Sequence, residues 1–371
     1  MLIKKKEIAL LLIFLSLVVT NLFAENYYFK RYDKENGLSQ QTVFCAVQDR
    51  RGFLWFGTKV GLNRFDGTKF KNYVADPEQP NSLPNNTVLA LAEAPDGSLW
   101  LGTSDGLCIY NPEKDTFAPF VSADLTIEGL IDNLVFDKQG NLWVINSKGI
   151  YCLDVKNGNH KFFAASDFFV PTGITVTQSG SVWVLGLDGN IYLFNPQRME
   201  FSSYPILTKE EKTKHILLYR ILECSNGDLV VTTDRIGARR FSPNNGEVKV
   251  LFSNDSQNNP IYIHTAIQRN KDEFWFGTES GIHIYQLDLG FIDHLQKSYN
   301  DAYSLSDNAV HMLLKDREEG IWVGTFFGGV NYLSSNNTLF DKYLPKDEKG
   351  SIKANVIREI HPDVEGNLWV G

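Results

Sequence analysis

One seven-residue segment recurs along the chain and constrains its fold more than any other feature. It first stands at residues 52–58 as Gly-Phe-Leu-Trp-Phe-Gly-Thr, and every tryptophan of the chain occupies its fourth position. These are Trp55, Trp100, Trp143, Trp183, Trp275, Trp322 and Trp369. Their spacing is 40 to 47 residues, except for one interval of 92 that equals two periods of 46. A degenerate copy therefore belongs in that interval, and residues 227–233 fit it, with Val230 in place of tryptophan.

Each copy is predicted to form a small antiparallel sheet of short strands. In the first copy these are residues 43–48, 53–58, 62–65 and 69–73, and the turns between them contain Asp and Gly. Glycine supplies the positive φ that tight hairpins need. A repeat of this length built from strands is typical of a propeller blade. Stacked blades would bury the tryptophan, and the glycine after it would let the next sheet approach closely.

We therefore predict an all-β chain: a seven-bladed β-propeller of four-stranded antiparallel blades, followed by the first part of a second propeller. Residues 26–32 resemble an outer strand without a blade, and pairing with the seventh copy would close the ring without an exposed edge. Residues 338–343 repeat that pattern before an eighth copy, which starts near residue 352. The seven copies are predicted at 43–73, 88–120, 131–163, 173–204, 216–252, 262–294 and 309–333.

The amino-terminal residues have the pattern of a secretory signal peptide. Three lysines precede an apolar run over residues 8–19, and we expect cleavage after Ala24. An uncleaved membrane anchor is the alternative. The predicted domains are the signal peptide (1–24), the first propeller (25–336) and the truncated start of the second (337–371). Because Gly371 is equivalent to Gly57 in the middle of a strand, we expect the chain to be the amino-terminal part of a longer protein.

Net charge limits the class of partner, and the positions of the cysteines bear on whether disulfides form. The net charge is -8, and it becomes -10 without Lys4, Lys5, Lys6 and Glu7 of the signal peptide. An acidic surface argues against nucleic acid as a partner. The cysteines lie at unmatched positions of different repeats, so we expect small buried apolar residues, with one disulfide as the alternative. They are Cys45, Cys108, Cys152 and Cys224.

Several motifs introduce or form the copies: Asn-Gly-Leu-Ser at 36–39, the runs 49–58 and 61–67, and the related segments 81–86 and 304–308. Together they resemble the two-component regulator propeller repeat over nearly all of the chain. The resemblance implies the periplasmic sensor region of a Bacteroidetes-type hybrid two-component histidine kinase. In that family two propellers and a β-sandwich precede a membrane span, a kinase, a receiver and a helix-turn-helix output. Such sensors typically detect oligosaccharides from glycan breakdown.

No catalytic residue, metal ligand or cofactor is predicted for this chain, and any kinase activity would belong to a part outside it. Four recurring carboxylates, Asp49, Asp96, Asp137 and Asp363, precede glycine in the same hairpin, so turn chemistry explains them. The seven histidines are scattered, and no pair has a spacing suited to a metal. No Gly-x-Ser-x-Gly motif is present.

Ligand-binding residues are predicted on one face of the ring. The loop that enters the inner strand and the loop between the second and third strands lie on that face, and there the copies differ most. The candidates are Lys59, Asn85, Asn86, Asp105, Lys148, Asp188, Asp234, Arg235, Glu279, Tyr299, Asn308, Phe326 and Phe327. Phe326 and Phe327 suit stacking on a sugar ring, or else they pack locally or against a second propeller. Arg235, Arg239 and Arg240 could receive an acidic sugar, or else form a solvated face.

The leading hypothesis is a non-enzymatic extracytoplasmic sensor that recognises a glycan-derived oligosaccharide and signals to a histidine kinase absent from this chain. We expect a homodimer in the full-length protein, no contact with nucleic acid, and membrane attachment only through a downstream span in the inner membrane. The alternatives are a secreted propeller enzyme acting on polysaccharide, as a lyase or glycosidase, and a purely structural interaction propeller.

Overall fold

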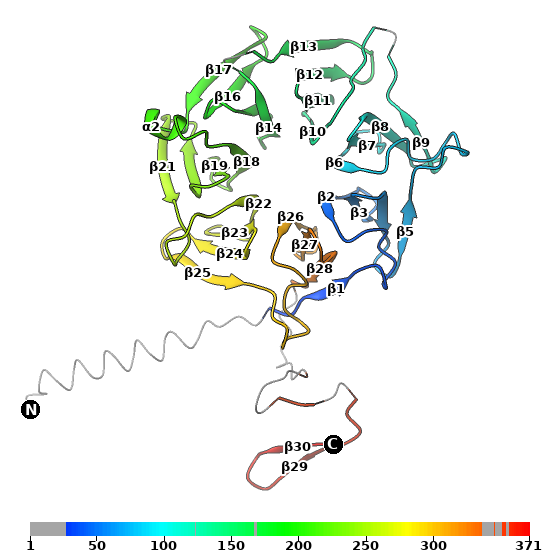
Figure 1. Cartoon of the computed structure of the whole chain (residues 1–371), viewed down its shortest axis with the longest axis vertical. Coiled ribbons are helices and arrows are strands. Elements are labelled where there is room, and N and C mark those ends of the chain that lie inside the picture. Colours follow the sequence, from blue (N-terminus) through cyan, green and yellow to red (C-terminus); the bar gives the residue numbers. More distant parts are fainter. Residues whose placement is uncertain (1–26, 123, 167–168, 336–344, 346–350, 354–355) are drawn as a thin grey trace, which may run out of the picture.

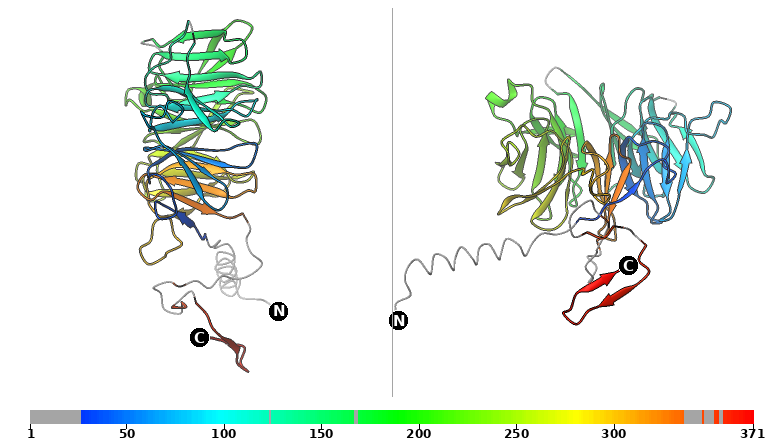
Figure 2. Two further views of the ribbon diagram at one scale, coloured as in Figure 1. Left: turned by 90° about the vertical axis from the view of Figure 1, so that its right-hand side faces the viewer. Right: turned by 60° about the horizontal axis from the view of Figure 1, so that its bottom comes forward.

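The computed structural model describes residues 27–122, 124–166, 169–335, 345, 351–353 and 356–371. The described residues form seven four-stranded antiparallel sheets, arranged as blades around a central axis (Figure 1). Seen edge-on, the ring is a thick disc (Figure 2). The predicted all-β, seven-bladed propeller is therefore confirmed. The predicted signal peptide (1–24) lies outside the described residues, and so does the strand predicted at 338–343.

The first four blades follow the chain in order. Blade one contains β2 (Val43–Gln48), β3 (Leu54–Thr58), β4 (Leu62–Phe65) and β5 (Phe70–Tyr73). Blade two contains β6 (Val88–Glu93), β7 (Leu99–Thr103), β8 (Gly106–Asn111) and β9 (Thr116–Pro119). Blade three contains β10 (Asn133–Phe136), β11 (Asn141–Asn146), β12 (Gly149–Asp154) and β13 (His160–Ala164). Blade four contains β14 (Pro171–Val176), β15 (Val182–Gly186), β16 (Asn190–Asn195) and β17 (Glu200–Pro205).

The short helix α2 (Lys209–Lys212) precedes blade five. Blade five contains β18 (Leu218–Glu223), β19 (Leu229–Thr233), β20 (Ala238–Ser242) and β21 (Glu247–Phe252). Blade six contains β22 (Ile263–Gln268), β23 (Glu273–Thr278), β24 (Gly281–Gln286) and β25 (Gly290–Leu295). Blade seven contains β26 (Val310–Lys315), β27 (Ile321–Thr325), β28 (Val330–Leu333) and, from the other end of the chain, β1 (Lys30–Tyr32).

The ring closes by the strand exchange that the sequence predicted. Strand β1 pairs antiparallel with β28, and Lys30 lies opposite Tyr332. The Arg31 guanidinium adds hydrogen bonds to the backbone oxygen of Ser304, at 2.8 Å from Nη2 and 3.1 Å from Nε. Residues about 300 positions apart thus complete one sheet, which leaves no unpaired edge at the join (Figure 1).

The core consists of clusters of buried side chains between neighbouring blades. In the cluster between blades one and two, Trp55, which is 1% exposed, packs with Leu99 and Leu101 of the next sheet. The other clusters likewise combine residues of two adjacent blades, and the last joins Trp322 of blade seven to Phe56 of blade one. The recurring tryptophan therefore contributes to the interfaces between sheets, where full burial of such a ring stabilises the fold by about 3–5 kcal/mol relative to alanine.

The glycine two residues after the tryptophan lets the next blade approach, as predicted. A β-carbon built on Gly57 would lie 2.8 Å from the Val88 side chain of blade two, and one on Gly277 would lie 2.6 Å from Val310 of blade seven. Real β-carbons essentially never come that close, so only glycine fits there.

The recurring aspartates serve the turns, and Asp49 and Asp137 also hold a buried tryptophan, as does Asp316 in the equivalent turn of blade seven. Asp137 accepts hydrogen bonds from the backbone N–H groups of Gln139 and Asn141, and its Oδ2 accepts the indole N–H of Trp143 at 2.8 Å. Asp49 and Asp316 repeat the indole contact in blades one and seven. Asp96 does not, because it stands two positions later in its turn and accepts only from Ser98.

Outside the ring, β29 (Ile360–Pro362) and β30 (Leu368–Val370) form a two-stranded hairpin (Figure 2). This hairpin repeats the turn geometry of the blades, because Asp363 accepts the indole N–H of Trp369. Trp369 is 69% exposed. The domain boundaries and the second propeller remain predictions.

Of the cysteines, Cys108 and Cys224 are buried as expected, whereas Cys45 and Cys152 are partly exposed, and all four are free. Within the described part of the chain, no helix has the length and apolar character needed to cross a bilayer.

The two aspartates of equivalent hairpins provide a matched test of the indole contact. We expect Asp137→Ala to lower the free energy of unfolding by more than about 2 kcal/mol, because it leaves buried N–H donors without a partner. Asp96→Ala, at an exposed position, should cost less than about 1 kcal/mol. Urea denaturation followed by tryptophan fluorescence measures both. Equal losses in the two variants would contradict the role assigned to the indole contact.

Candidate functional site

The two sets of loops that the sequence assigned to one face do lie together. In blades one, two, four, five and seven, the backbone N–H after the second strand donates to the residue that precedes the inner strand of the same blade. Lys59 N donates to the Thr42 oxygen, Ser104 N to Thr87 and Phe326 N to Ala309, at 2.9–3.2 Å. The threonine that ends the second strand closes the same loop, and Thr58 Oγ1 donates to the Gly61 oxygen at 2.9 Å. This end of the ring is called the loop face below.

On the loop face, an irregularity near the start of the inner strand recurs in six of the described sheets. The register between the first and second strands skips one residue, as between Val43 and Cys45. Such a bulge leaves the skipped residue unpaired and re-aims its side chain. The skipped residues are Phe44, Leu89, Thr172, Tyr219, His264 and His311.

All six skipped residues line a pocket of about 590 Å³, together with Asp132 and Asn133 of blade three. The set is called the axial ring below, because its members come from the innermost strands of all seven blades. A pocket of this volume suits a small organic ligand. It is the candidate functional site, and it lies at the central axis of the loop face.

The walls of the pocket differ from one side of the axis to the other. Leu130, Leu187 and Leu217, which are 53%, 45% and 37% exposed, form an apolar side over blades three to five. Tyr219, 37% exposed, stands next to the Arg220 side chain, which also lines the pocket. Apolar and aromatic walls with a few polar groups are typical of sites that bind small molecules.

A cluster of two histidines and a glutamate stands at the side of the pocket formed by blades six and seven. The rings of His264 and His311 stack with their centroids 4.2 Å apart and an angle of 14° between their planes. Glu279 Oε1 lies 2.5 Å from His264 Nε2 and 3.8 Å from His311 Nε2. Burial and the adjacent His264 lower the pKa of His311 to about 4, so this imidazole is neutral at neutral pH.

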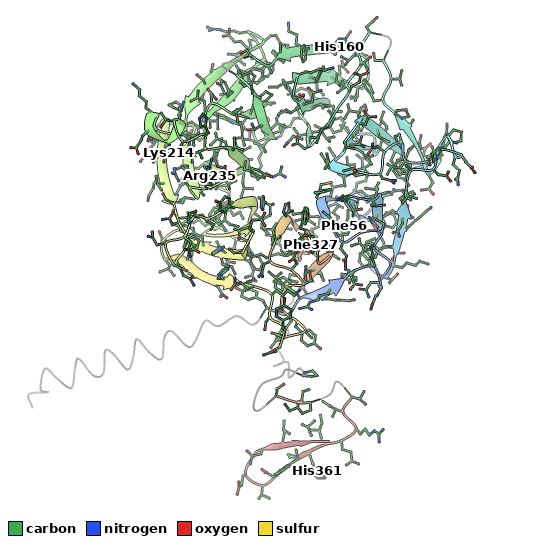
Figure 3. The ribbon with its side chains drawn as sticks, viewed as in Figure 1. Phe56, His160, Lys214, Arg235, Phe327 and His361 are labelled. Carbon is green, nitrogen blue, oxygen red and sulfur yellow. The ribbon has the colours of Figure 1, made fainter. Side chains whose placement is uncertain are left out.

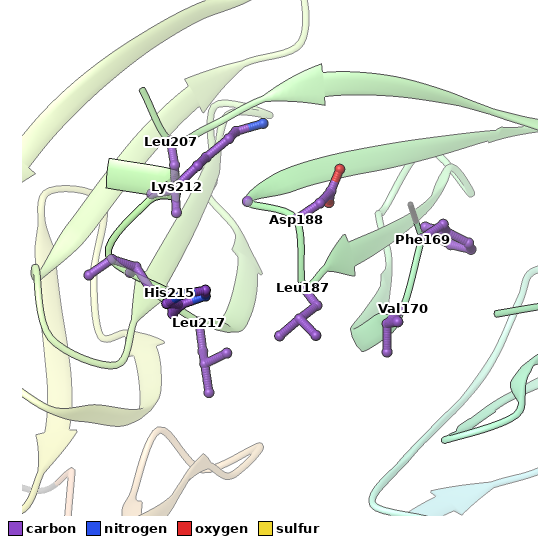
Figure 4. Close-up of a pocket in the computed structure, with 10 residues that line it drawn as sticks. Phe169, Val170, Leu187, Asp188, Leu207, Lys212, His215 and Leu217 are labelled. Atoms are coloured by element: carbon purple, nitrogen blue, oxygen red, sulfur yellow. The ribbon is translucent and has the colours of Figure 1, made fainter. Parts of the chain in front are cut away.

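A smaller pocket of about 320 Å³ lies beside the central one, between blades four and five (Figure 4). Asp188 and Lys212 extend to one side of it, and Leu187 and Leu217 extend to the other (Figure 4). The Asp188 carboxylate accepts the Tyr192 hydroxyl at 2.7 Å, which fixes its orientation. Because Leu187 and Leu217 line both pockets, the two cavities are neighbours on the loop face.

None of the thirteen residues predicted from the loops lines the central pocket. Asp188 lines the smaller pocket. Glu279 and Phe326 contact the histidines of the central pocket, Phe326 with its ring 5.2 Å from that of His311. Phe327, 69% exposed, packs edge-on against Phe326. Figure 3 labels Phe327 on blade seven and Arg235 on blade five. Ligand binding by any of these residues stays a prediction.

Other predicted residues hold loops in place. Asn85 Oδ1 accepts the Thr87 N–H, Asn86 Oδ1 that of Ala75, and Asn308 Oδ1 that of Lys297. Asp234 accepts the Leu217 N–H and is paired with Arg235.

The rest are more exposed. Lys59 and Asp105 are exposed loop residues. Lys148 lies 3.9 Å from Glu128. Tyr299, 92% exposed, lines a separate pocket that also includes Arg31.

Arg239 of the degenerate blade is not part of a solvated face, so that expectation is wrong for this residue. Its side chain is 2% exposed, and its guanidinium pairs with Glu211 of α2 at 2.8 Å and donates to the Ile236 oxygen at 2.7 Å. Arg240 pairs with Asp228, which is itself buried. Arg235 donates to the backbone oxygen of His215 at 2.8 Å. The three arginines therefore hold blade five and the segment before it together.

The sequence prediction missed the axial ring and treated the histidines as scattered, which is wrong for His264 and His311. These two residues are 47 positions apart, the same interval as between Trp275 and Trp322. They therefore occupy the same position in adjacent copies, and an alignment of the copies could have found them. In such an alignment, the position directly after the first apolar residue of the inner strand holds different residue types in most copies.

Comparison with known proteins supports the identification of the repeat. Residues 37–59, 82–105 and 304–327 match the family described as two component regulator propeller, so the chain contains these repeats. A segment of 53 residues, 14% of the chain, is 49% identical to histidine kinase P4 of Formosa agariphila and covers 4% of that protein.

Solved structures share the fold. The extracellular domain described as part of the hybrid two component system BT3049 from B. thetaiotaomicron is 25% identical, with a TM-score of 0.72, over 93% of this chain and 47% of that one. The chain thus spans about half the length of that domain. Virginiamycin B lyase from Staphylococcus aureus, 12% identical, superimposes with a TM-score of 0.64 over 83% of this chain and 99% of its own, which shows the fold alone.

Arg239 and Arg235 form a matched pair for testing what the arginines do. We expect Arg239→Met to lower the free energy of unfolding by more than about 2 kcal/mol, because Glu211 and buried carbonyl oxygens lose a charged donor. Arg235→Met, at a side chain 41% exposed, should cost less than about 1 kcal/mol. Thermal and urea unfolding measure the difference. A fully stable Arg239→Met variant would contradict the structural role.

Proposed function

We propose that this chain is the extracytoplasmic sensor region of a hybrid two-component regulator, which recognises a glycan-derived oligosaccharide in the central pocket and signals to a histidine kinase outside this chain. The sensor role is supported by the propeller repeats and by the likeness to an extracellular domain of a hybrid two-component system. The periplasm is the compartment that fits such a domain. The single observation that carries the ligand proposal is the axial ring, which brings the bulged residues of six inner strands around one pocket.

The chemistry of the pocket supports a carbohydrate. Sugars present apolar ring faces and many hydroxyl groups, so they need flat apolar or aromatic surfaces beside hydrogen-bonding groups. Tyr219 and Phe44 provide aromatic rings, and Thr172, Asn146 and Asp132 provide polar groups. Arg220 adds a positive charge, which favours an acidic sugar over a basic one.

Signal transmission requires that the ligand bind one arrangement of the receptor better than another. We propose that the full-length protein is a homodimer and that oligosaccharide binding shifts the population of two arrangements of its chains. The ring itself is closed by β1, so the movement would involve whole propellers rather than single blades.

A secreted enzyme acting on polysaccharide is the second candidate, and one observation favours it. His264 and Glu279 lie within hydrogen-bonding distance beside the pocket, and such a pair can move a proton in a lyase or glycosidase reaction. The sensor proposal is preferred because the repeats and the extracellular domain both point to two-component signalling.

Titration calorimetry of the purified chain against neutral and acidic oligosaccharides from plant and host glycans tests the ligand. We expect one class of oligosaccharide to bind, and Tyr219→Ala to weaken that binding at least ten-fold, about 1.4 kcal/mol, because the ligand loses an aromatic surface. Tyr299→Ala is the matched control, since Tyr299 is exposed outside the central pocket, and it should bind as the wild type does.

The outcome separates the alternatives. Absence of binding across the panel, or equal affinity in the Tyr219→Ala variant, would contradict oligosaccharide sensing in this pocket.

Chain-length analysis of the oligosaccharides after overnight incubation tests the enzyme, and products shorter than the substrate would favour it. The coding sequence after codon 371 tests the signalling part: a membrane span and kinase motifs are expected there, and a stop codon would argue against them.

A further inference from the structure

The histidine–glutamate cluster, formed by His264, Glu279 and His311, combines residues from two blades. His264 follows the first residue of β22, and His311 occupies the same position in β26 of the next blade. Glu279 belongs to the loop between β23 and β24. One ligand atom from each of the three lies within 4.8 Å of the other two. Propeller stacking therefore brings together three metal-ligating groups that are spread over 48 positions of the sequence.

Aromatic rings pack against the two imidazoles. The Tyr219 ring meets His264 edge-on at 5.5 Å, and the Phe326 ring lies 5.2 Å from His311. The side chains of His264 and His311 are 16% and 22% exposed, whereas Glu279 is 53% exposed. In the described residues, His264 Nδ1 is buried without a hydrogen-bond partner. The ring can therefore rotate slightly without breaking a bond at that atom.

Two imidazole nitrogens and one carboxylate oxygen form a donor set that suits first-row divalent ions such as Zn²⁺. We propose that the histidine–glutamate cluster is a binding site for a Zn²⁺-class divalent cation, with a fourth coordination position open to the central pocket. A tetrahedral ion with bonds of about 2.0–2.1 Å needs ligand atoms roughly 3.3 Å apart. Binding therefore requires rotation of the exposed Glu279 and of the two rings.

Charged groups of both signs lie near the cluster. Glu279 supplies the negative charge, and Asp307 adds another near His311, while Arg220 contributes a positive charge and donates its Nε–H to the His264 oxygen at 3.1 Å. Neutral imidazoles bind first-row ions more strongly than they bind Mg²⁺ or Ca²⁺, which prefer oxygen ligands. The site is therefore selective for Zn²⁺ and similar ions, and this selectivity does not depend on whether the pocket also binds an oligosaccharide.

The test uses the purified chain, free of histidine tags and of added sugar. Calorimetric titration with ZnCl₂, elemental analysis after dialysis and the visible spectrum with Co²⁺ report binding, stoichiometry and coordination. We expect one Zn²⁺ per chain and a four-coordinate Co²⁺ spectrum, with Mg²⁺ and Ca²⁺ failing to compete. Glu279→Gln and His311→Ala should each weaken Zn²⁺ binding at least ten-fold.

Control variants make the test specific. His294 stacks on His283 in the same blade, with centroids 3.8 Å apart, so His294→Ala removes a comparable histidine pair and should leave the affinity for Zn²⁺ unchanged. Glu279→Gln alters an exposed side chain, and an unchanged melting temperature without metal shows that it is folded. Lack of saturable Zn²⁺ and Co²⁺ binding would overturn the proposal. So would Zn²⁺ binding of wild-type strength in both cluster variants, or displacement of Zn²⁺ by equimolar Ca²⁺.

Discussion

The stacking of each sheet against the next is the interaction on which the whole ring depends. A single four-stranded blade has two faces with apolar side chains, and it can bury them only between two neighbours. At four interfaces the approach is tightest where a glycine of one blade meets the inner strand of the next, as for Gly57 with Val88 and Gly324 with Val43. Since blade seven meets blade one in this way and β1 completes blade seven, no blade is left with an uncovered face.

These four glycines lie in blades six, seven, one and two, which are consecutive around the ring. The equivalent positions in blades three, four and five hold the larger residues Ile145, Leu185 and Thr232. Most residues that line the central pocket come from these same three blades and the loops before them. The pocket is therefore lined mainly by the side of the ring where the position two residues after the tryptophan slot is not glycine.

The sequence predicted the fold closely because the fold repeats. Turn residues, tryptophans and glycines recur at fixed positions, so each copy supported the interpretation of the others, down to the pairing of β1 with β28. The candidate site was predicted less well. The predicted loop residues lie on the face that holds the central pocket, but the bulged residues Tyr219, His264 and His311 stand out only when the copies are aligned. Arg239 was misjudged as exposed, because only tertiary structure reveals that Glu211 of α2 covers it.

A pocket at the axis has a mechanical consequence that a pocket on one blade would lack. Its lining comes from the inner strands of all seven blades, and these strands are held by the interfaces on both of their sides. A ligand there contacts several blades at once, so it favours the arrangement of the ring in which all those contacts are made together. Displacing one blade would break two packed interfaces, and such interfaces shift between discrete arrangements rather than deform continuously. In the proposed sensor, ligand binding would therefore be transmitted by reorientation of the whole ring, or by the loops around the pocket mouth.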